Sequence, residues 1–117
     1  MTTPDVPSWT FLTNHGHVLI CVATDSDARI SDIAERVGIG VRAAQGIVND
    51  LVGTGYVIRS RHGRRNRYEI NRDLRLRHPL EAEHRMMEAL GETLWEAQRA
   101  TRAPDERAYL ERLKRLR

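Results

Sequence analysis

The sequence predicts a mostly α-helical protein with a small β-ribbon, and three observations lead to this prediction. Apolar residues recur at helical spacing in the segments 14–24, 32–37 and 41–54. A strand, a turn and a second strand are indicated between residues 56 and 70. Positive charge is concentrated in residues 57–78, where eight arginines stand against two acids, although the whole chain has a net charge of +3. A basic surface confined to one element indicates a nucleic-acid partner.

The length of 117 residues leaves room for one compact domain, expected at 9–78, and an appended helical part, expected at 79–117. The longest unbroken apolar run, 18–23, is far shorter than the roughly 20 residues of a membrane span. The N-terminus lacks the basic and apolar regions of a secretory signal, and the single Cys21 cannot form an intramolecular disulfide. We therefore expect a cytoplasmic protein that does not enter a membrane.

The first helix is expected at about 14–24. Residues 1–8 contain Pro4 and Pro7 and no periodic apolar pattern, so we expect a poorly ordered lead-in, with structure beginning near Trp9. Thr13 or Asn14 can cap the helix, and the apolar positions that follow lie on one side of it.

A short second helix is expected at about 32–37, after the polar run 24–27 has ended the first. Ile30 is expected to form a one-residue strand and Ser31 to cap the helix. Gly38 is well placed to end it, because glycine commonly follows the last helical residue.

The third helix is expected at about 41–54 and has two different faces. One face is apolar and consists of Val41, Ala44, Ile47, Val48, Leu51 and Val52. The other face presents Arg42, Ala43, Gln45, Gly46, Asn49 and Asp50. Gly55 stops the helix, and a strand at 56–61, a turn at 62–66, a strand at 67–70 and a basic connector at 71–78 follow.

The C-terminal part is expected to be helical. Pro79 can open a helix that runs to about Arg102, and Pro104 can start a short last helix. The apolar stripe of the longer helix can pack on the same chain or on a partner. Because a domain of about 70 residues leaves little core for a further long helix, we expect the seam of a two-fold homodimer. The expected seam residues are Leu80, Met87, Leu90, Leu94 and Trp95, with Ala97 at the end of the stripe.

The order helix, short helix, tight turn, helix and two-stranded ribbon is that of a winged helix-turn-helix. Three segments carry a resemblance to a known family: ISDIAERVGI at 30–39, VRAAQGIVNDL at 41–51 and GYV at 55–57. They resemble the second and third helices of small bacterial winged helix-turn-helix regulators of the MarR-like and ArsR-like kind. GRRNRY at 63–68 and RHPLE at 77–81 look like one subgroup of these regulators, and the resemblance covers about residues 9–90.

This resemblance implies a transcriptional regulator that binds double-stranded DNA, with helix 41–54 in the major groove and the ribbon on backbone or minor groove. The residue types agree with it. Arginine pairs with guanine, glutamine and asparagine with adenine, and alanine touches the thymine methyl. Arginines on a ribbon meet phosphates or a narrow minor groove. The expected DNA contacts are Arg42, Ala43, Gln45, Gly46, Asn49, Arg61, Arg64, Arg65, Asn66 and Arg67.

Two features depart from the resemblance or leave an alternative open. The family often has Ser or Thr where this chain has Gly40, which can cap a helix but supplies no side-chain oxygen. Asp50 places an acid near the expected DNA face, where it either orients an arginine or points away. For the polar face of helix 41–54 and for the arginines of the ribbon, the simpler interpretation is a solvated surface that contacts no partner. The alternative function is a protein-interaction or RNA-binding module.

Other chemistry finds little support in the residues. No phosphate-binding loop, nucleophile elbow or carboxylate pair is present, so we expect no enzyme and no cofactor. His15 and His17 do not share a helical face, and the Cys box of ArsR-like metal sensors is absent, so we expect no metal site. Cys21 lies in the apolar run of the first helix, where a buried inert thiol is favoured over a redox sensor.

Overall fold

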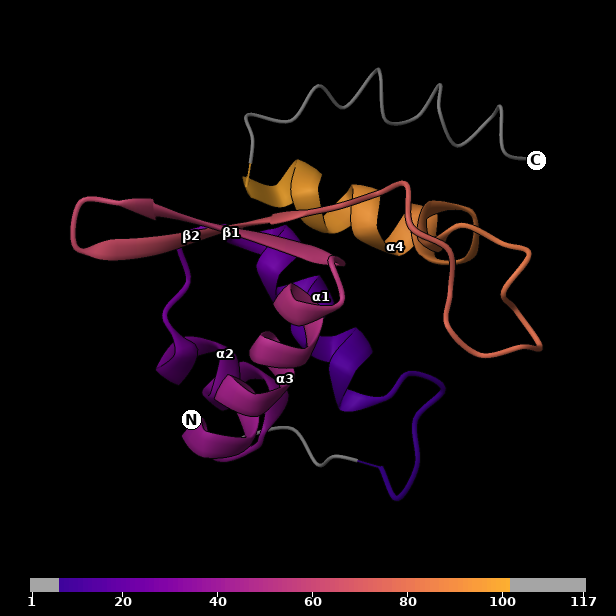
Figure 1. Cartoon of the computed structure of the whole chain (residues 1–117). Coiled ribbons are helices and arrows are strands. Elements are labelled where there is room, and N and C mark those ends of the chain that lie inside the picture. Colours follow the sequence, from indigo (N-terminus) through magenta and orange to yellow (C-terminus); the bar gives the residue numbers. More distant parts are fainter. Residues whose placement is uncertain (1–6, 102–117) are drawn as a thin grey trace.

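The computed structural model describes residues 7–101 and the side chains of residues 7–96. This part of the chain forms four helices and a two-stranded antiparallel sheet, a small α+β arrangement (Figure 1). The predicted combination of helices with one small ribbon is confirmed at this level. In order, the elements are α1 (Asn14–Thr24), α2 (Ile30–Val37), α3 (Val41–Gly53), β1 (Val57–His62), β2 (Arg65–Ile70) and α4 (Met86–Thr101).

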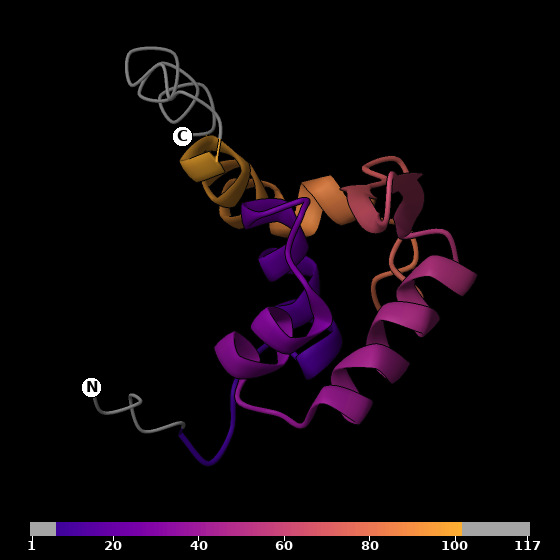
Figure 2. The ribbon, with the colours of Figure 1, turned by 90° about the vertical axis from the view of Figure 1, so that its left-hand side faces the viewer.

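The core is built around α1, which contacts α2, α3, α4 and β2. Figure 2 shows α3 lying obliquely beside α1 and α2, with its C-terminal end next to the hairpin. Aliphatic side chains fill the centre, as the scarcity of aromatic residues requires. The largest fully buried side chains are those of Ile33, Met86, Leu94, Val18, Val22, Val48 and Val57.

The start of α2 differs from the prediction. Ile30 is the first residue of the helix and does not form a strand. The carboxylate of Asp32 accepts a hydrogen bond from the backbone N–H of Arg29 at 3.2 Å, which allows the helix to begin two residues earlier than a Ser31 cap would. The predicted end is confirmed, because Gly38 adopts φ +85° and its N–H donates to the carbonyl of Ala34 at 2.9 Å.

The β-hairpin has a shorter turn than predicted. His62 pairs with Arg65, so the turn consists of Gly63 and Arg64 alone, and Asn66 belongs to β2. Gly63 has φ +65° and no non-glycine residue in the described range has a positive φ, which is the pattern of a type II′ turn. This turn type is favoured because it matches the twist of the flanking strands. β1 therefore ends at His62 and β2 begins at Arg65, both closer to the tip than the sequence pattern indicated.

The start of α4 also corrects the prediction. The helix begins at Met86 and not near Pro79, because residues 74–86 form a loop closed by non-local backbone bonds. Leu76 N–H donates to the His84 carbonyl at 3.0 Å and Met86 N–H to the Leu74 carbonyl at 2.8 Å. Leu80 lies in this loop with 87% of its surface exposed. Residues 1–6 of the lead-in expected at 1–8, the Ala97 side chain and the helix expected after Pro104 lie outside the described residues.

Candidate nucleic-acid interface

The outward face of α3 carries the residues that the sequence singled out for base contacts. Ala44, Val48 and Leu51 are buried, which turns the opposite side of the helix to solvent. That exposed side holds Arg42, Ala43, Gly46 and Asn49, with Gln45 half-buried between them. The Gln45 amide donates a hydrogen bond from Nε2 to Asn49 Oδ1 at 3.0 Å. The expected contact residues of this helix therefore lie together on one accessible surface.

Asp50 is directed to a partner on another helix. Its Oδ2 lies 2.9 Å from Nε2 of His15, a residue in the first turn of α1. Both side chains are about half exposed or more, so the pair adds little to stability. The acid is thus engaged at the α1 side of α3, and among the described residues it forms no salt bridge with an arginine.

The hairpin presents its arginines on both faces, because directly paired residues share a face of a two-stranded sheet. Arg59 and Arg61 lie on the same face as the buried Tyr68, while Arg65 and Arg67 lie on the other. Arg64 is at the tip, which projects beyond the helices in Figure 1. All five side chains are exposed.

Most of these arginines are available to a partner. Within the described part of the chain no carboxylate lies within salt-bridge distance of Arg59, Arg61, Arg64 or Arg67. Arg61 makes only a long contact, 3.4 Å, from Nε to the carbonyl of Gly63 at the tip. None of these four guanidinium groups is held in a direct ion pair, so each can pair with a phosphate of a partner.

Arg65 is the exception, because the protein itself holds its guanidinium. Nη2 of Arg65 donates to the backbone carbonyl of Asp27 at 2.7 Å. On the same strand, the N–H of Tyr68 donates to the carbonyl of Ser26 at 2.9 Å. Together the two bonds fasten β2 to the turn at 25–28, which connects α1 and α2. Sequence reasoning missed this contact, since the run Asp25-Ser26-Asp27 indicated only a break between helices.

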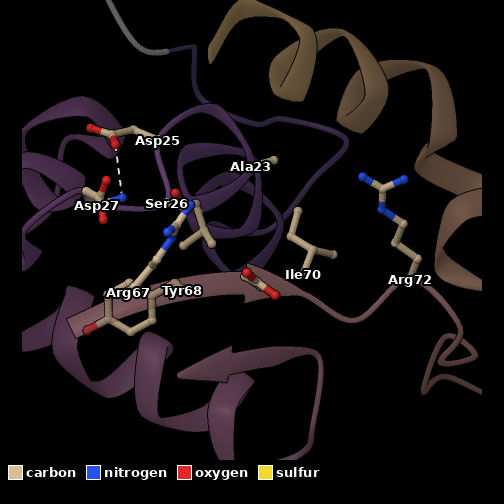
Figure 3. A pocket seen from close by; sticks show the side chains of 10 residues that line it. Ala23, Asp25, Ser26, Asp27, Arg67, Tyr68, Ile70 and Arg72 are labelled. Atoms are coloured by element: carbon tan, nitrogen blue, oxygen red, sulfur yellow. Dashed lines mark hydrogen bonds between the residues drawn. The ribbon is translucent and has the colours of Figure 1, made fainter. Parts of the chain in front are cut away.

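A cavity of about 490 Å³ lies between this turn and β2 (Figure 3). The Arg67 side chain of β2 reaches toward the turn, whereas the Tyr68 ring lies on the other side of the strand. Within the turn the Asp27 N–H donates to Asp25 Oδ1 at 3.0 Å. Arginines and acids line the cavity together, so it favours neither a cation nor an anion. Its charged lining residues are Asp25, Asp27, Arg67, Glu69 and Arg72.

The residues predicted to form a dimer seam do not make one continuous surface. Leu94 is fully buried in the core of its own chain. Leu80 lies in the loop before α4 and is not part of the helix. Met87 and Leu90 are half-buried and pack on the same core. The exposed side of α4 instead carries Glu88, Glu92 and Glu96, spaced four residues apart. The stripe therefore serves the core of this chain, and its assignment to a seam is wrong for Leu94.

The remaining side chains with chemical potential are structural in character. Cys21 is 6% exposed, and burial raises the pKa of its thiol, with nearby Arg36 acting in the opposite direction. The expected burial of this thiol is confirmed. No group of three or more His, Cys, Asp or Glu that could hold a metal ion occurs within residues 7–96. None of the described helices is long and apolar enough to cross a membrane.

Comparison with known proteins places part of the chain in a family. Residues 56–115 match the family described as "Domain of unknown function (DUF1841)", and the chain belongs to that family. The match begins one residue before β1 and covers the hairpin, the loop at 74–86 and α4, whereas α1, α2 and α3 precede it. No curated protein matches the chain.

Proposed function

We propose that the protein is a sequence-specific, double-stranded DNA-binding transcriptional regulator of the winged helix-turn-helix type that acts in the cytoplasm. In this proposal α2 and α3 form the helix-turn-helix, α3 is the recognition helix and the hairpin is the wing. The observation that carries the proposal is the combination of two exposed surfaces on neighbouring elements. One is the α3 face with Arg42, Gln45 and Asn49, and the other is the set of exposed arginines of the hairpin.

The two surfaces supply different parts of DNA recognition. Arginines on a ribbon bind phosphates or enter a narrow minor groove, and such contacts give affinity for any sequence. Polar side chains on one face of a helix reach base edges in the major groove, where each base pair has its own pattern of donors and acceptors. Arg61, Arg64 and Arg67 fit the first role, and Asn66 lies beside them on β2. Arg42, Ala43, Gln45 and Asn49 fit the second, and Gly46 allows close approach.

We further propose a homodimer that reads two half-sites, each with one recognition helix. Its seam does not follow the whole predicted stripe, because Leu94 is inaccessible and Leu80 lies outside α4. Met87, Leu90 and Trp95 are half-buried and are the members of that stripe that can also contact a second copy.

Electrophoretic mobility shifts on duplex DNA, duplex RNA and single strands test the proposal. We expect the tightest binding to duplex DNA, with an affinity that falls as salt rises because phosphate contacts release counterions. Arg64→Ala should weaken binding to every sequence and lower the salt slope by about 1. Binding to duplex RNA or to single strands in preference to duplex DNA would favour the alternative, an RNA-binding or protein-interaction module.

A further inference from the structure

Two amide side chains on the exposed face of α3 are already joined to each other in the protein. Gln45 and Asn49 are one helical turn apart, the spacing at which side chains of a helix meet. Gln45 Nε2 donates to Asn49 Oδ1 at 3.0 Å, and Gln45 is half-buried whereas Asn49 is exposed. The amide plane of Gln45 is therefore held in one orientation before any partner arrives.

The hydrogen bond leaves the two amides with different remaining capacities. A primary amide nitrogen carries two hydrogens, so Gln45 keeps one N–H donor as well as its Oε1 acceptor. This adjacent donor and acceptor match the N7 acceptor and the N6–H donor that adenine displays in the major groove. Asn49 has committed its carbonyl oxygen to Gln45, and its remaining groups are the two N–H donors and one oxygen lone pair.

The neighbouring Gly46 leaves open space beside this pair. Apart from its chain neighbours and the backbone of its own helix, a Cβ built at Gly46 would meet no described atom within 4 Å, so packing against the rest of the protein does not require glycine here. A glycine inside a helix costs roughly 0.5–1 kcal/mol relative to alanine. A base-pair edge brought to Gln45 can approach the helix backbone closely at this position.

We propose that Gln45 is the specificity-determining residue for an adenine in the bound site, and that Asn49 is a positioning residue that holds the Gln45 amide. Orientation matters because a bidentate contact needs both hydrogen bonds in one plane, and a freely rotating glutamine loses side-chain entropy when it is fixed. The inference rests on the proposed function, and it assigns one base pair to two residues of α3.

The test begins with selection of duplexes from a random pool by the full-length protein, followed by dissociation constants for all four bases at each selected position. Gln45→Ala should reduce the preference for adenine at one base pair by roughly tenfold or more. Asn49→Ala should reduce the preference at that same base pair, and Asn49→Ala in the Gln45→Ala background should reduce it no further. Asn49 is exposed and Gln45 is half-buried on α3, and thermal melts check that each variant is folded.

Asn49→Asp is the matched control. A carboxylate oxygen still accepts the hydrogen bond from Gln45 Nε2, so the adenine preference should survive while the added negative charge weakens binding to every sequence. A change of preference at a different base pair in Asn49→Ala, or loss of the adenine preference in Asn49→Asp, would overturn the positioning role. If the unsubstituted protein selects no sequence, the proposed function itself fails, and this outcome is seen before any variant is examined.

Discussion

Arg64 and Arg65 are adjacent in sequence and both are exposed, but only the Arg65 guanidinium donates a hydrogen bond to another segment of the protein. The Arg65 guanidinium closes the wing onto the turn at 25–28 through the Asp27 carbonyl. From the sequence alone both residues were predicted to contact DNA. Nothing in a run of basic residues indicates which of them donates a hydrogen bond to a backbone carbonyl elsewhere in the chain. Arg64 is left for an outside partner, and Arg65 shares its donors between the fold and that partner.

The pair Arg64→Ala and Arg65→Ala tests this difference without DNA. We expect Arg65→Ala to lower the free energy of unfolding by about 0.5–1.5 kcal/mol, the net contribution of one hydrogen bond. Arg64→Ala should change it by less than about 0.5 kcal/mol, as is usual for a surface position. Urea denaturation of the two variants provides the measurement, and equal stabilities would show that the bond to Asp27 does not hold the wing.

The buried thiol of Cys21 gives a pH dependence. Its pKa is raised in the folded protein, so the folded state favours the neutral thiol. This contribution is complete below the ordinary pKa of about 8.5 and is lost as the pH rises through the higher folded value. The unfolding free energy of the natural protein should therefore fall, relative to Cys21→Ala, as the pH rises above about 8.5. Denaturation curves of both proteins across this range measure it, and a constant difference would contradict the prediction.

At the scale of elements, α4 acts as part of the core. The spacing of apolar residues correctly predicted that this helix has an apolar stripe. It could not predict what the stripe packs on, because the spacing is the same for a helix that packs on its own chain and for one that packs on a second copy. The contact between α4 and α1 joins opposite ends of the described chain, and no local pattern reports such a contact.

Leu94 and Leu80 separate these roles, since both belonged to the predicted stripe. Leu94→Ala should reduce the unfolding free energy by about 2–5 kcal/mol, because it leaves a cavity in the core. Leu80→Ala, at a side chain that is 87% exposed, should change it by less than about 0.5 kcal/mol. Calorimetric or urea unfolding measures the stability of both variants. A Leu94→Ala variant as stable as the unsubstituted protein would contradict the core role of Leu94 and support its place in the dimer seam.

The sequence predicted α1 and α3 to within a residue, because their apolar spacing and glycine or polar boundaries are local signals. It failed where a distant backbone group decided the structure. Pro79 with Leu80 resembled a helix start, but the loop at 74–86 is closed by backbone hydrogen bonds from Leu76 to His84 and from Met86 to Leu74, and both bonds join the predicted helix to the connector before it. The α3 contact residues were predicted by face, whereas the hydrogen bond between Gln45 and Asn49 could be seen only with side chains in place.

At the scale of the whole molecule, charge is divided between distinct parts of the surface. The wing carries exposed arginines, and the outward side of α4 carries Glu88, Glu92 and Glu96. A phosphate backbone attracts the first surface and repels the second, so an approaching duplex orients the protein before any base is contacted. A symmetric seam along the glutamates would bring like charges together, which disfavours that side of α4 as a dimer interface.

A two-fold dimer predicts the form of the DNA site. Duplexes selected from a random pool should contain an inverted repeat whose half-site centres are separated by about 10 base pairs or a multiple of it. Insertion of 5 base pairs should reduce the affinity toward that of one half-site, because the second recognition helix then faces the wrong side of the duplex. Insertion of 10 should restore much of it. An affinity that ignores the spacing would indicate that the protein binds as a monomer.

The packing of α4 on α1 also bears on the order in which the protein is made. Residues 14–70, which include every proposed DNA contact, leave the ribosome before Met86 and Leu94 are available to cover α1. Until then the emerging chain has an incomplete core and exposes apolar surface that can associate wrongly. Completion of the fold therefore waits for the C-terminal part of the chain, and a polypeptide truncated before α4 lacks Met86 and Leu94, the part of the core that covers α1.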